Sequence, residues 1–127
     1  KGMCVGPQNA EETEQTYDTL DKQMEDPYSI YNFVKQTISI RNAFPEIARG
    51  TNTFEKDLSN DNVCIFTREY NGEKAVLIFN PSKDEASVDV SSLGVNDAVA
   101  MLQTTKKAPS YKDGTAKLPA YSVLVLK

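Results

Sequence analysis

The segment FTREYNGEKAVLIFN, residues 66–80, constrains the fold of this 127-residue chain more than any other. Asn71-Gly72 separates two runs that are rich in β-branched and aromatic residues. Asn-Gly suits a two-residue type I′ turn, because both central residues of that turn need positive φ. We therefore predict an antiparallel hairpin in which Tyr70 faces Glu73.

This turn fixes the register of the hairpin, since a shift by one residue would move every side chain to the opposite face. Glu69 then faces Lys74 as an opposite-charge pair. The next pairs are apolar: Phe66 with Leu77, Ile65 with Ile78, and Cys64 with Phe79. Both faces of the hairpin base are apolar, so one needs a second sheet and the other needs a helix or a neighbouring domain as cover.

Further strands are predicted near 47–55 and at 85–90, 97–103, 115–118 and 121–126. Turn signals separate them at Asn80-Pro81-Ser82, Leu93-Gly94, Asp113-Gly114 and Pro119. Short strands at this spacing are typical of a β-sandwich. The predicted fold is mainly β: an antiparallel Greek-key β-sandwich over 50–127, preceded by an α-helical segment.

The preceding segment, DPYSIYNFVKQTISIRNAFPEIAR, predicts a helix over about 27–43. We expect Asp26 to cap this helix, Pro27 to occupy its first position, and Pro45 to end it. Its apolar residues follow helical spacing: Ile30, Phe33, Val34 and Ile38 on one face, widened by Tyr31 and Ile40. Because an isolated helix of this length is marginal in water, its apolar face must pack against something.

Composition excludes several classes of function. The net charge of −4 argues against nucleic acid and anionic membranes as partners. No apolar run is long enough to span a bilayer. Histidine is absent, which excludes His-based catalytic triads and the usual zinc ligands. Seven acidic residues between Glu11 and Asp26 predict a solvated surface, with a short helix over about 17–24.

The two cysteines do not make a disulfide framework. Cys64 lies in the apolar run VCIF, so a buried free thiol is the simplest interpretation, and a Cys4–Cys64 bridge is the alternative. The first residue is Lys1 rather than Met, and the opening stretch KGMCVGPQNAEE lacks the basic-then-apolar pattern of a signal peptide. We interpret it as a processed chain or a fragment.

Several stretches together resemble the α-amylase family, glycoside hydrolase family 13. DPYSIYNFVKQTISIRNAFPEIARG resembles the last barrel helix and the lead into the C-terminal domain. FTREYNGEKAVLIFNPSKDEASVDV resembles the central strands of that domain, with an arginine, a turn containing Gly-Glu, and an apolar strand ending in Asn. LPAYSVLVLK resembles the final strand, and GMC near the start resembles the variable loop after the eighth barrel strand.

The resemblance covers about 26–127 and implies two parts. Residues 1–49 would be the loop and last helix of a truncated (β/α)8 barrel, and 50–127 the C-terminal β-sandwich domain. Enzymes of the family hydrolyse or transfer α-glucosidic bonds, and their catalytic carboxylates lie upstream on the barrel. The motifs around those carboxylates are absent here, so the resemblance gives no catalytic residue and no cofactor. It suggests a bacterial extracellular or cell-associated enzyme.

The residues themselves also give no catalytic pair. A retaining glycosidase needs two carboxylates about 5–5.5 Å apart, and none of the 18 acidic residues can be paired from sequence. Asp57, Asn60, Asp61 and Asn62 could bind Ca²⁺ weakly, but a turn is the preferred interpretation, and we assign no metal ligand. Lys106, Lys107 and Lys112 predict a solvated basic loop. Pro81 blocks the glycosylation outline at Asn80.

Tyrosine side chains are the candidates for weak sugar contact, because aromatic faces pack against sugar rings. Tyr70 flanks the hairpin turn, and Tyr111 lies in KKAPSYKDG, which we expect to be an exposed loop. Tyr28 and Tyr31, on the helix, are interpreted as buried. The leading hypothesis is a non-catalytic C-terminal portion that stabilises a missing barrel acting on α-glucans. The alternative is a stand-alone module that binds polysaccharide or protein, and a homodimer through the helix is a third way to cover the apolar face.

Overall fold

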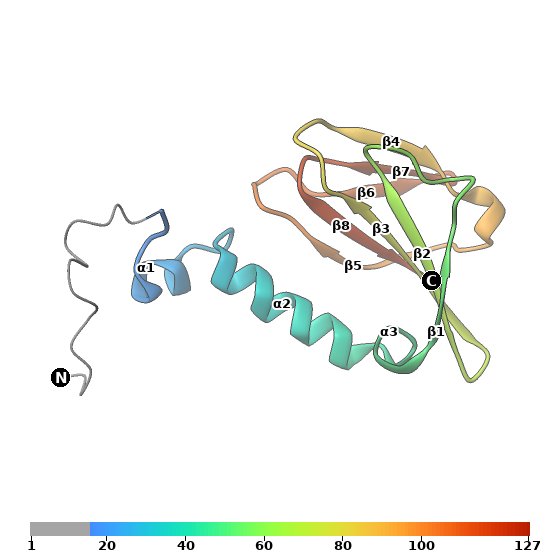
Figure 1. Cartoon of the computed structure of the whole chain (residues 1–127), viewed down its shortest axis with the longest axis horizontal. Helices are drawn as coiled ribbons and strands as arrows, with labels where there is room; N and C mark the ends of the chain where they lie inside the picture. Colours follow the sequence, from blue (N-terminus) through green and yellow to red (C-terminus); the bar gives the residue numbers. More distant parts are fainter. Residues whose placement is uncertain (1–15) are drawn as a thin grey trace.

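The computed structural model describes residues 16–127, which form a helical arm followed by a two-sheet β-sandwich (Figure 1). The arm contains α1 (Leu20–Glu25), α2 (Ile30–Ala43) and α3 (Pro45–Arg49). Cys4, the GMC stretch and the first part of the acidic run lie outside the described residues. The Cys4–Cys64 bridge therefore stays untested.

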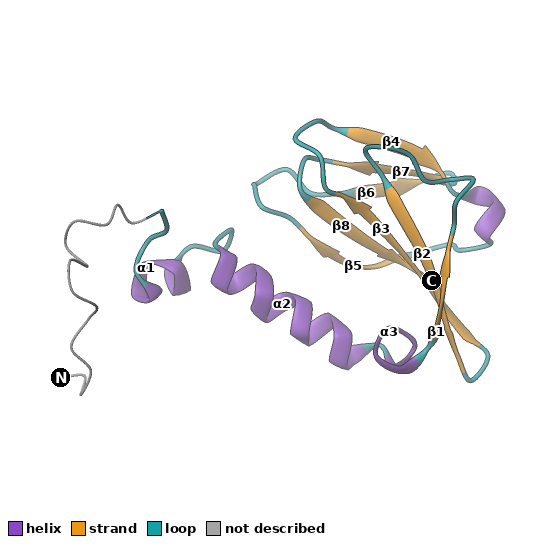
Figure 2. Ribbon diagram, viewed as in Figure 1, coloured by secondary structure: helices purple, strands orange, loops and turns teal. Residues whose placement is uncertain are grey.

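The strands of the described chain form two antiparallel sheets (Figure 2). The larger sheet has the order β1-β2-β3-β8-β5, and the smaller has the order β4-β7-β6. The chain changes sheet after β3, β4, β5 and β7, which places β8 between β3 and β5 and confirms the predicted antiparallel sandwich. The strands are β1 (Thr51–Phe54), β2 (Cys64–Tyr70), β3 (Glu73–Asn80), β4 (Ala86–Asp89), β5 (Ala98–Leu102), β6 (Ser110–Lys112), β7 (Thr115–Leu118) and β8 (Ser122–Leu126), with a 3₁₀ helix, η2 (Ser91–Leu93), after β4.

The predicted hairpin of β2 and β3 is confirmed. Asn71 and Gly72 have φ values of 52° and 83°, as the tight turn requires. Tyr70 faces Glu73, and each predicted pair down to Cys64 and Phe79 is present. Local turn chemistry and cross-strand packing agree here, which is why this register follows from sequence.

The hydrophobic core lies between the two sheets. Ile65, Ile78 and Leu124 reach it from the larger sheet, and Leu118 reaches it from the smaller one; all four are fully buried. Inward positions alternate with outer ones along β2 and β3, as the period of two requires. The core is thus continuous across the sandwich and does not include α2, which has no buried residue.

Helix α2 starts later than predicted. Its N-cap is Ser29, whose hydroxyl accepts a hydrogen bond from the Asn32 backbone N–H at 3.2 Å. Asp26 instead accepts from the backbone N–H of Tyr28 at 2.9 Å, so Asp26 and Pro27 form a turn before the helix. Serine suits the cap as well as aspartate does, and the aspartate is held in this turn. Pro45 ends α2 as predicted.

Three other expectations were wrong. Residues 47–49, placed at the start of a strand near 47–55, belong to helix α3 (Pro45–Arg49), because Pro45 fits a helical first turn. Tyr111 lies on strand β6 rather than in an exposed loop, since Asp113-Gly114 closes a second tight hairpin with β7. Cys64 is half-exposed rather than buried, because it lies on the outer face of the larger sheet. The short helix near 17–24 is present as α1.

Candidate functional site: an apolar helix face and its joint

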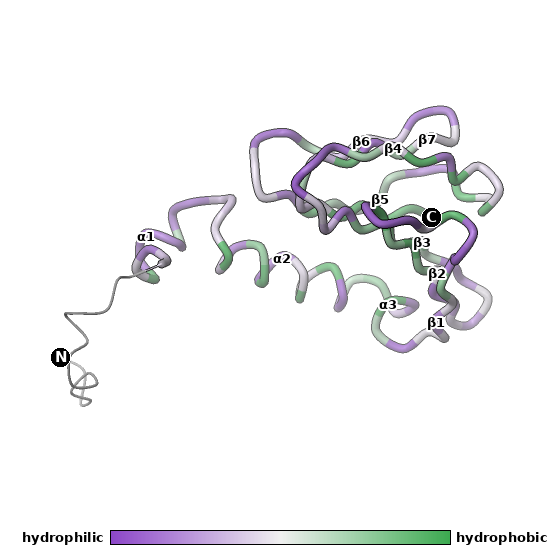
Figure 3. Tube along the Cα trace, turned by 45° about the horizontal axis from the view of Figure 1, so that its top comes forward, coloured by the Kyte–Doolittle hydropathy of each residue, from purple (hydrophilic) through white to green (hydrophobic). Residues whose placement is uncertain are grey.

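The most conspicuous surface feature is an apolar stripe along α2, formed by Ile30, Val34 and Ile38. These side chains are 52%, 49% and 54% exposed. They repeat every four residues and therefore share one side of the helix. Leu20 from α1 extends the stripe, and the two helices enclose an open groove of about 530 Å³. Figure 3 shows apolar residues recurring along α2, outside the sandwich.

Polar side chains of the DPYSIYNF segment hold α1 against α2. The Asn32 amide donates hydrogen bonds to the backbone carbonyls of Gln23 and Asp26, at 3.0 and 2.8 Å. The Ser29 hydroxyl, besides capping α2, donates to the Gln23 carbonyl at 2.5 Å. These bonds satisfy backbone groups left free at the end of α1. They fix the groove, so its apolar lining is presented by an ordered pair of helices.

The opposite side of α2 and helix α3 face the outer surface of the larger sheet. Phe33 lines a hollow of about 280 Å³ together with Phe79 and Tyr121. Ala75 and Val125, on the outer face of the sheet, are buried, as expected beneath α3, which contacts β2 and β3. The helices therefore supply part of the cover that the two-sided apolar hairpin requires.

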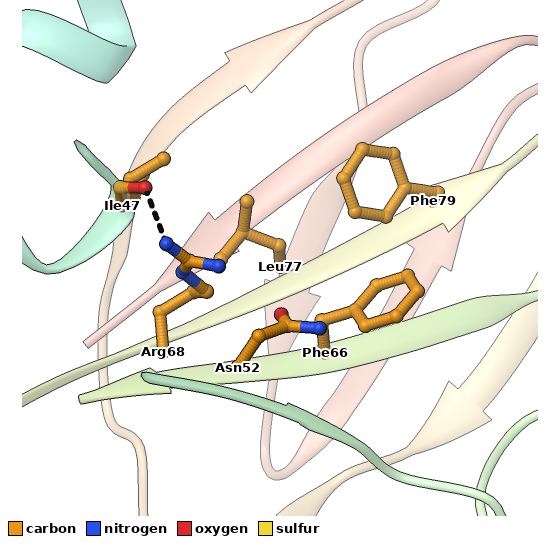
Figure 4. Close-up of a pocket in the computed structure, with 6 residues that line it drawn as sticks. All are labelled: Ile47, Asn52, Phe66, Arg68, Leu77 and Phe79. Atoms are coloured by element: carbon orange, nitrogen blue, oxygen red, sulfur yellow. Dashed lines mark hydrogen bonds between the residues drawn. The ribbon is translucent and has the colours of Figure 1, made fainter. Parts of the chain in front are cut away.

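The remainder of this outer face carries a row of aromatic rings. Phe66 lies between Phe54 and Phe79, with ring centroids at 5.3 and 5.9 Å. Phe54 is 49% exposed at the edge of the sheet. Phe66 and Phe79 also line a hollow of about 270 Å³ bounded by Arg68 and Ile47 (Figure 4). The row lies on the same face of the larger sheet as α3, whose Ile47 lines this hollow.

Arg68 fastens α3 to the sheet. Its guanidinium donates to the backbone carbonyls of Glu46 and Ile47, at 3.3 and 3.0 Å (Figure 4 shows the second bond). Carbonyls in a short helix have few partners within it, and the planar fork of arginine can reach two of them. Gly50, at the end of α3, leaves no room for a side chain, since a Cβ there would lie 2.4 Å from the Glu46 carbonyl oxygen.

A charged pair closes the joint from the other side. Glu46 has a side chain only 3% exposed, and its Oε1 lies 2.5 Å from the Lys127 ammonium. Glu46 Oε1 has no partner in hydrogen-bond geometry among the described residues, so its contact with Lys127 is an ion pair. It also lies 3.2 Å from Glu73 and 6.0 Å from the centre of the Phe44 ring. One cation thus links α3, the hairpin turn and the end of β8.

The pair shifts the titration of both partners. Burial by itself would raise the pKa of Glu46, but the adjacent Lys127 outweighs burial and holds that pKa below its ordinary value. Contacts with Glu46 and Glu73 raise the pKa of Lys127. Both groups are therefore charged at neutral pH. The charges form a structural contact in which the Lys127 ammonium lies within ion-pair distance of both Glu46 and Glu73.

The two tyrosines proposed as sugar contacts are not brought together. Tyr70 is half-buried at the end of β2, in the larger sheet. Tyr111 is half-buried in the smaller sheet, where its ring packs against the core and its hydroxyl donates to the Val95 carbonyl at 2.8 Å. Their separation into two sheets rules out a shared stacking platform. Single weak contacts at either ring are neither supported nor contradicted by this placement.

The remaining candidates form ordinary surface structure. The Asn60 side chain accepts from the backbone N–H groups of Asn62 and Val63, at 2.8 and 3.0 Å, which is a turn as preferred. Lys107 forms an exposed ion pair with Glu85. Over residues 16–127, no group of three or more His, Cys, Asp or Glu side chains is arranged to bind a metal ion. No helix in this range is long and apolar enough to cross a membrane.

Sequence reasoning missed Glu46, Arg68 and Lys127 as a connected set. From sequence, Arg68 is identified only as the arginine that recurs in the family resemblance, and Glu46 in PEIAR has no assigned role. The three lie far apart in the sequence and meet only through the strand order, so no spacing rule links them. The available local signal was Gly50 directly after a short helical segment.

Comparisons with known proteins agree with this architecture. A family model described as Maltogenic Amylase, C-terminal domain, matches residues 57–125. Eubacterium rectale Amy13B is 98% identical, with a TM-score of 0.93, over 100% of this chain and 25% of Amy13B. Trehalulose synthase MutB from Pseudomonas mesoacidophila MX-45 is 23% identical, with a TM-score of 0.69, over 84% of this chain and 19% of MutB, which indicates a shared fold. A comparison with curated proteins found no match. The chain thus spans 25% or less of the length of these two structures.

Proposed function

The chain belongs to the family of maltogenic amylase C-terminal domains, and on this premise we propose that it braces the catalytic barrel of an α-amylase-family hydrolase without taking part in the chemistry. The helices α1 to α3 are proposed to pack against the rest of the barrel, and the sandwich to stabilise the barrel by packing on these helices. Residues 1–49 are proposed to belong to the barrel itself, and 50–127 to the appended domain. The whole enzyme is proposed to hydrolyse α-glucans through a covalent glycosyl intermediate.

The exposed stripe of Ile30, Val34 and Ile38 is the observation that carries this proposal. Contiguous exposed apolar surface on a water-soluble protein marks an interaction site. Amy13B extends well beyond the match, which covers 25% of its chain, so a partner within the same polypeptide is available there. The net charge of −4 and the acidic start of the arm disfavour nucleic acid and anionic lipid as other partners.

A charge placed in the stripe tests the proposal. In the longer enzyme, Val34→Glu should lower the melting temperature and the activity on soluble starch, because the carboxylate would be buried without a partner. In the 127-residue chain alone, at a concentration low enough to keep it monomeric, the same substitution should leave the unfolding midpoint almost unchanged, since Val34 is exposed there.

Gln36→Glu is the matched control, because it adds the same carboxylate to an exposed position of the same helix outside the stripe. It should leave both proteins unchanged. Equal effects of Val34→Glu and Gln36→Glu in the longer enzyme would contradict a buried contact at the stripe.

The same stripe supports a finer proposal, that the isolated chain pairs with a second copy through α2. Pairing would remove the apolar side chains from water when no barrel is present. Sedimentation equilibrium should then show a dimer that Val34→Glu dissociates. A monomer that binds no hydrophobic dye would contradict both pairing and an available stripe.

Weak contact of Tyr70 or Tyr111 with α-glucan also stays a proposal. It rests on the exposed part of each half-buried ring. Titration of the chain with maltoheptaose, followed by tyrosine fluorescence, should show low affinity that Tyr70→Ala or Tyr111→Ala removes. An unchanged spectrum at saturating sugar would refute it.

A further inference from the structure

The joint between α2 and the sandwich has more polar contacts than are needed to attach a helix of five residues. It consists of α3 with Phe44 and Gly50, the guanidinium of Arg68, and the ion pair of Glu46 with Lys127. We propose that this joint is a rigid clasp that fixes the direction of α2 relative to the sandwich, with Glu46 as its lock. The inference concerns the described chain alone and stands whether or not the stripe contacts a barrel.

The burial of Glu46 is the first argument. A buried carboxylate loses hydration, and an ion pair rarely gains more stability than well-packed apolar side chains would. A five-residue helix could be held by apolar contacts alone, and Ile47 already provides one. The pair does specify one arrangement: the Lys127 side chain is 30% exposed, but a displaced α3 would leave the buried Glu46 carboxylate unpaired. The ion pair of Glu46 and Lys127 therefore contributes by fixing the position of α3 relative to the sheet.

The second observation is that α3 is held by two side chains, those of Arg68 and Lys127, whose backbones are fixed in the sheet. Arg68 lies within β2, paired with Asn52 and Ala75 on the neighbouring strands. The backbone of Lys127 is held at the end of the sheet, where its N–H donates to Asp97 at 2.9 Å and its carbonyl accepts from Asn96 at 2.7 Å. Neither group can follow α3 if that helix moves.

The third observation is that the backbone at the end of α3 lies in close contact with the backbone of β2. A Cβ at Gly50 would lie 2.4 Å from the Glu46 carbonyl oxygen and 2.7 Å from that of Glu69. Both atoms belong to the main chain, so neither can turn aside as a side chain would. The helix and the strand thus meet without free space, and α2 leaves this contact through Phe44, which ends α2 and caps α3.

Limited proteolysis of the 127-residue chain can test the clasp. Arg49 is exposed at the end of α3, so trypsin should cut after Arg49 only when the joint opens locally. Arg68 lies within the central part of the hairpin, and a cut there requires global unfolding. Fragments identified by mass spectrometry therefore report the two events separately in one reaction.

Glu46→Gln should raise the rate of cleavage after Arg49 by about tenfold or more, since a charge-assisted contact is lost. Gly50→Ala should also raise the rate of cleavage after Arg49, because the added Cβ would clash with the backbone oxygens of Glu46 and Glu69. Cleavage after Arg68 should change far less in both variants. Glu85→Gln is the matched control, because it removes a carboxylate from an exposed ion pair, and it should alter neither rate.

An unchanged rate after Arg49 in both variants would overturn the inference. So would rates after Arg49 and Arg68 that rise in parallel, because the joint would then open only with the whole domain. A variant that folds poorly is recognised in the same reaction, because poor folding raises the cleavage rates after Arg49 and Arg68 together.

Discussion

Replacing Asn80 with aspartate changes one buried amide into a carboxylate of nearly the same shape. Asn80 ends β3 and is 1% exposed. Its Nδ2 donates to the backbone carbonyls of Asp84, Leu118 and Pro119, at 2.8, 3.1 and 2.8 Å, and its Oδ1 accepts from Ser82. The amide therefore joins the end of the larger sheet to the connection between β7 and β8. The substitution keeps the volume and removes both hydrogens.

The expected loss follows from the number of donors. The amide has two hydrogens shared among three carbonyl oxygens, so two full hydrogen bonds disappear. Each buried acceptor left unsatisfied costs about 1–3 kcal/mol, which gives about 2–6 kcal/mol in total. Domains have a free energy of unfolding of about 5–15 kcal/mol, so Asn80→Asp should remove a large part of the stability.

The loss should depend on pH. Burial and the facing carbonyl oxygens disfavour the charged form and raise the pKa of the introduced carboxylate in the folded state. Below its unfolded pKa of about 3.9 the group is protonated in both states, and its O–H can restore one bond. The deficit relative to wild type should therefore be smallest in acid and should grow as the pH rises through the folded pKa.

Urea unfolding followed by far-UV circular dichroism, at pH 4 and pH 7, provides the assay. With a slope of about 2 kcal/mol/M, the midpoint at pH 7 should fall by roughly 1–3 M. Asn62→Asp, at an exposed loop position, makes the same chemical change and should leave the midpoint nearly unchanged. Equal midpoints for the two variants, or a deficit that grows in acid, would refute the reasoning.

Two further predictions concern the core and the ion pair. Ile65 is fully buried, so Ile65→Ala should lower the free energy of unfolding by about 2–5 kcal/mol, whereas Met101→Ala, at an exposed position of the same sheet, should cost under about 1 kcal/mol in the same urea titration. Burial raises the pKa of Glu46, but Lys127, which also contacts Glu73, lowers it below the unfolded value of 4.5. The ion pair therefore stabilises the fold above pH 4.5 and loses that contribution as the pH falls through the folded pKa of Glu46. The gap in stability between wild type and Glu46→Gln should accordingly narrow on acidification, and a gap that widened in acid would mean that Glu46 is destabilised by its site.

Sequence was sufficient where local chemistry decides the structure. Asn71-Gly72 imposes positive φ, and that turn determines every pair along β2 and β3. Helical spacing also identifies Ile30, Val34 and Ile38 as one face of α2, but it included Phe33 in that face, whereas Phe33 lines the hollow beside Phe79 and Tyr121. The start of α2 was wrong because Asp26 and Ser29 are both good caps, and only the hydrogen bond from Asn32 to Ser29 shows which one is used.

Sequence was insufficient where a short element depends on tertiary partners. Helix α3 has five residues and β6 has three, too few to show a period. Lys127 is a terminal basic residue in the sequence, and nothing near it indicates a buried carboxylate as its partner. The strand order brings Lys127 to Glu46, and that order is decided by packing of the whole core.

The stripe and the joint have opposite physical characters, and this contrast bears on how they work together. The stripe leaves apolar side chains in water, which costs free energy unless something covers them. The joint places a charge in a buried site, which costs free energy unless its geometry is kept. A flexible arm would need only the apolar stripe, since it could move to fit any surface that covers the stripe. A rigid joint behind an apolar stripe instead presents that stripe at one position relative to the sandwich, so less conformational entropy is lost when its partner binds. A rigid joint at Glu46 would therefore strengthen the contact proposed at Val34, although the two residues are not in contact.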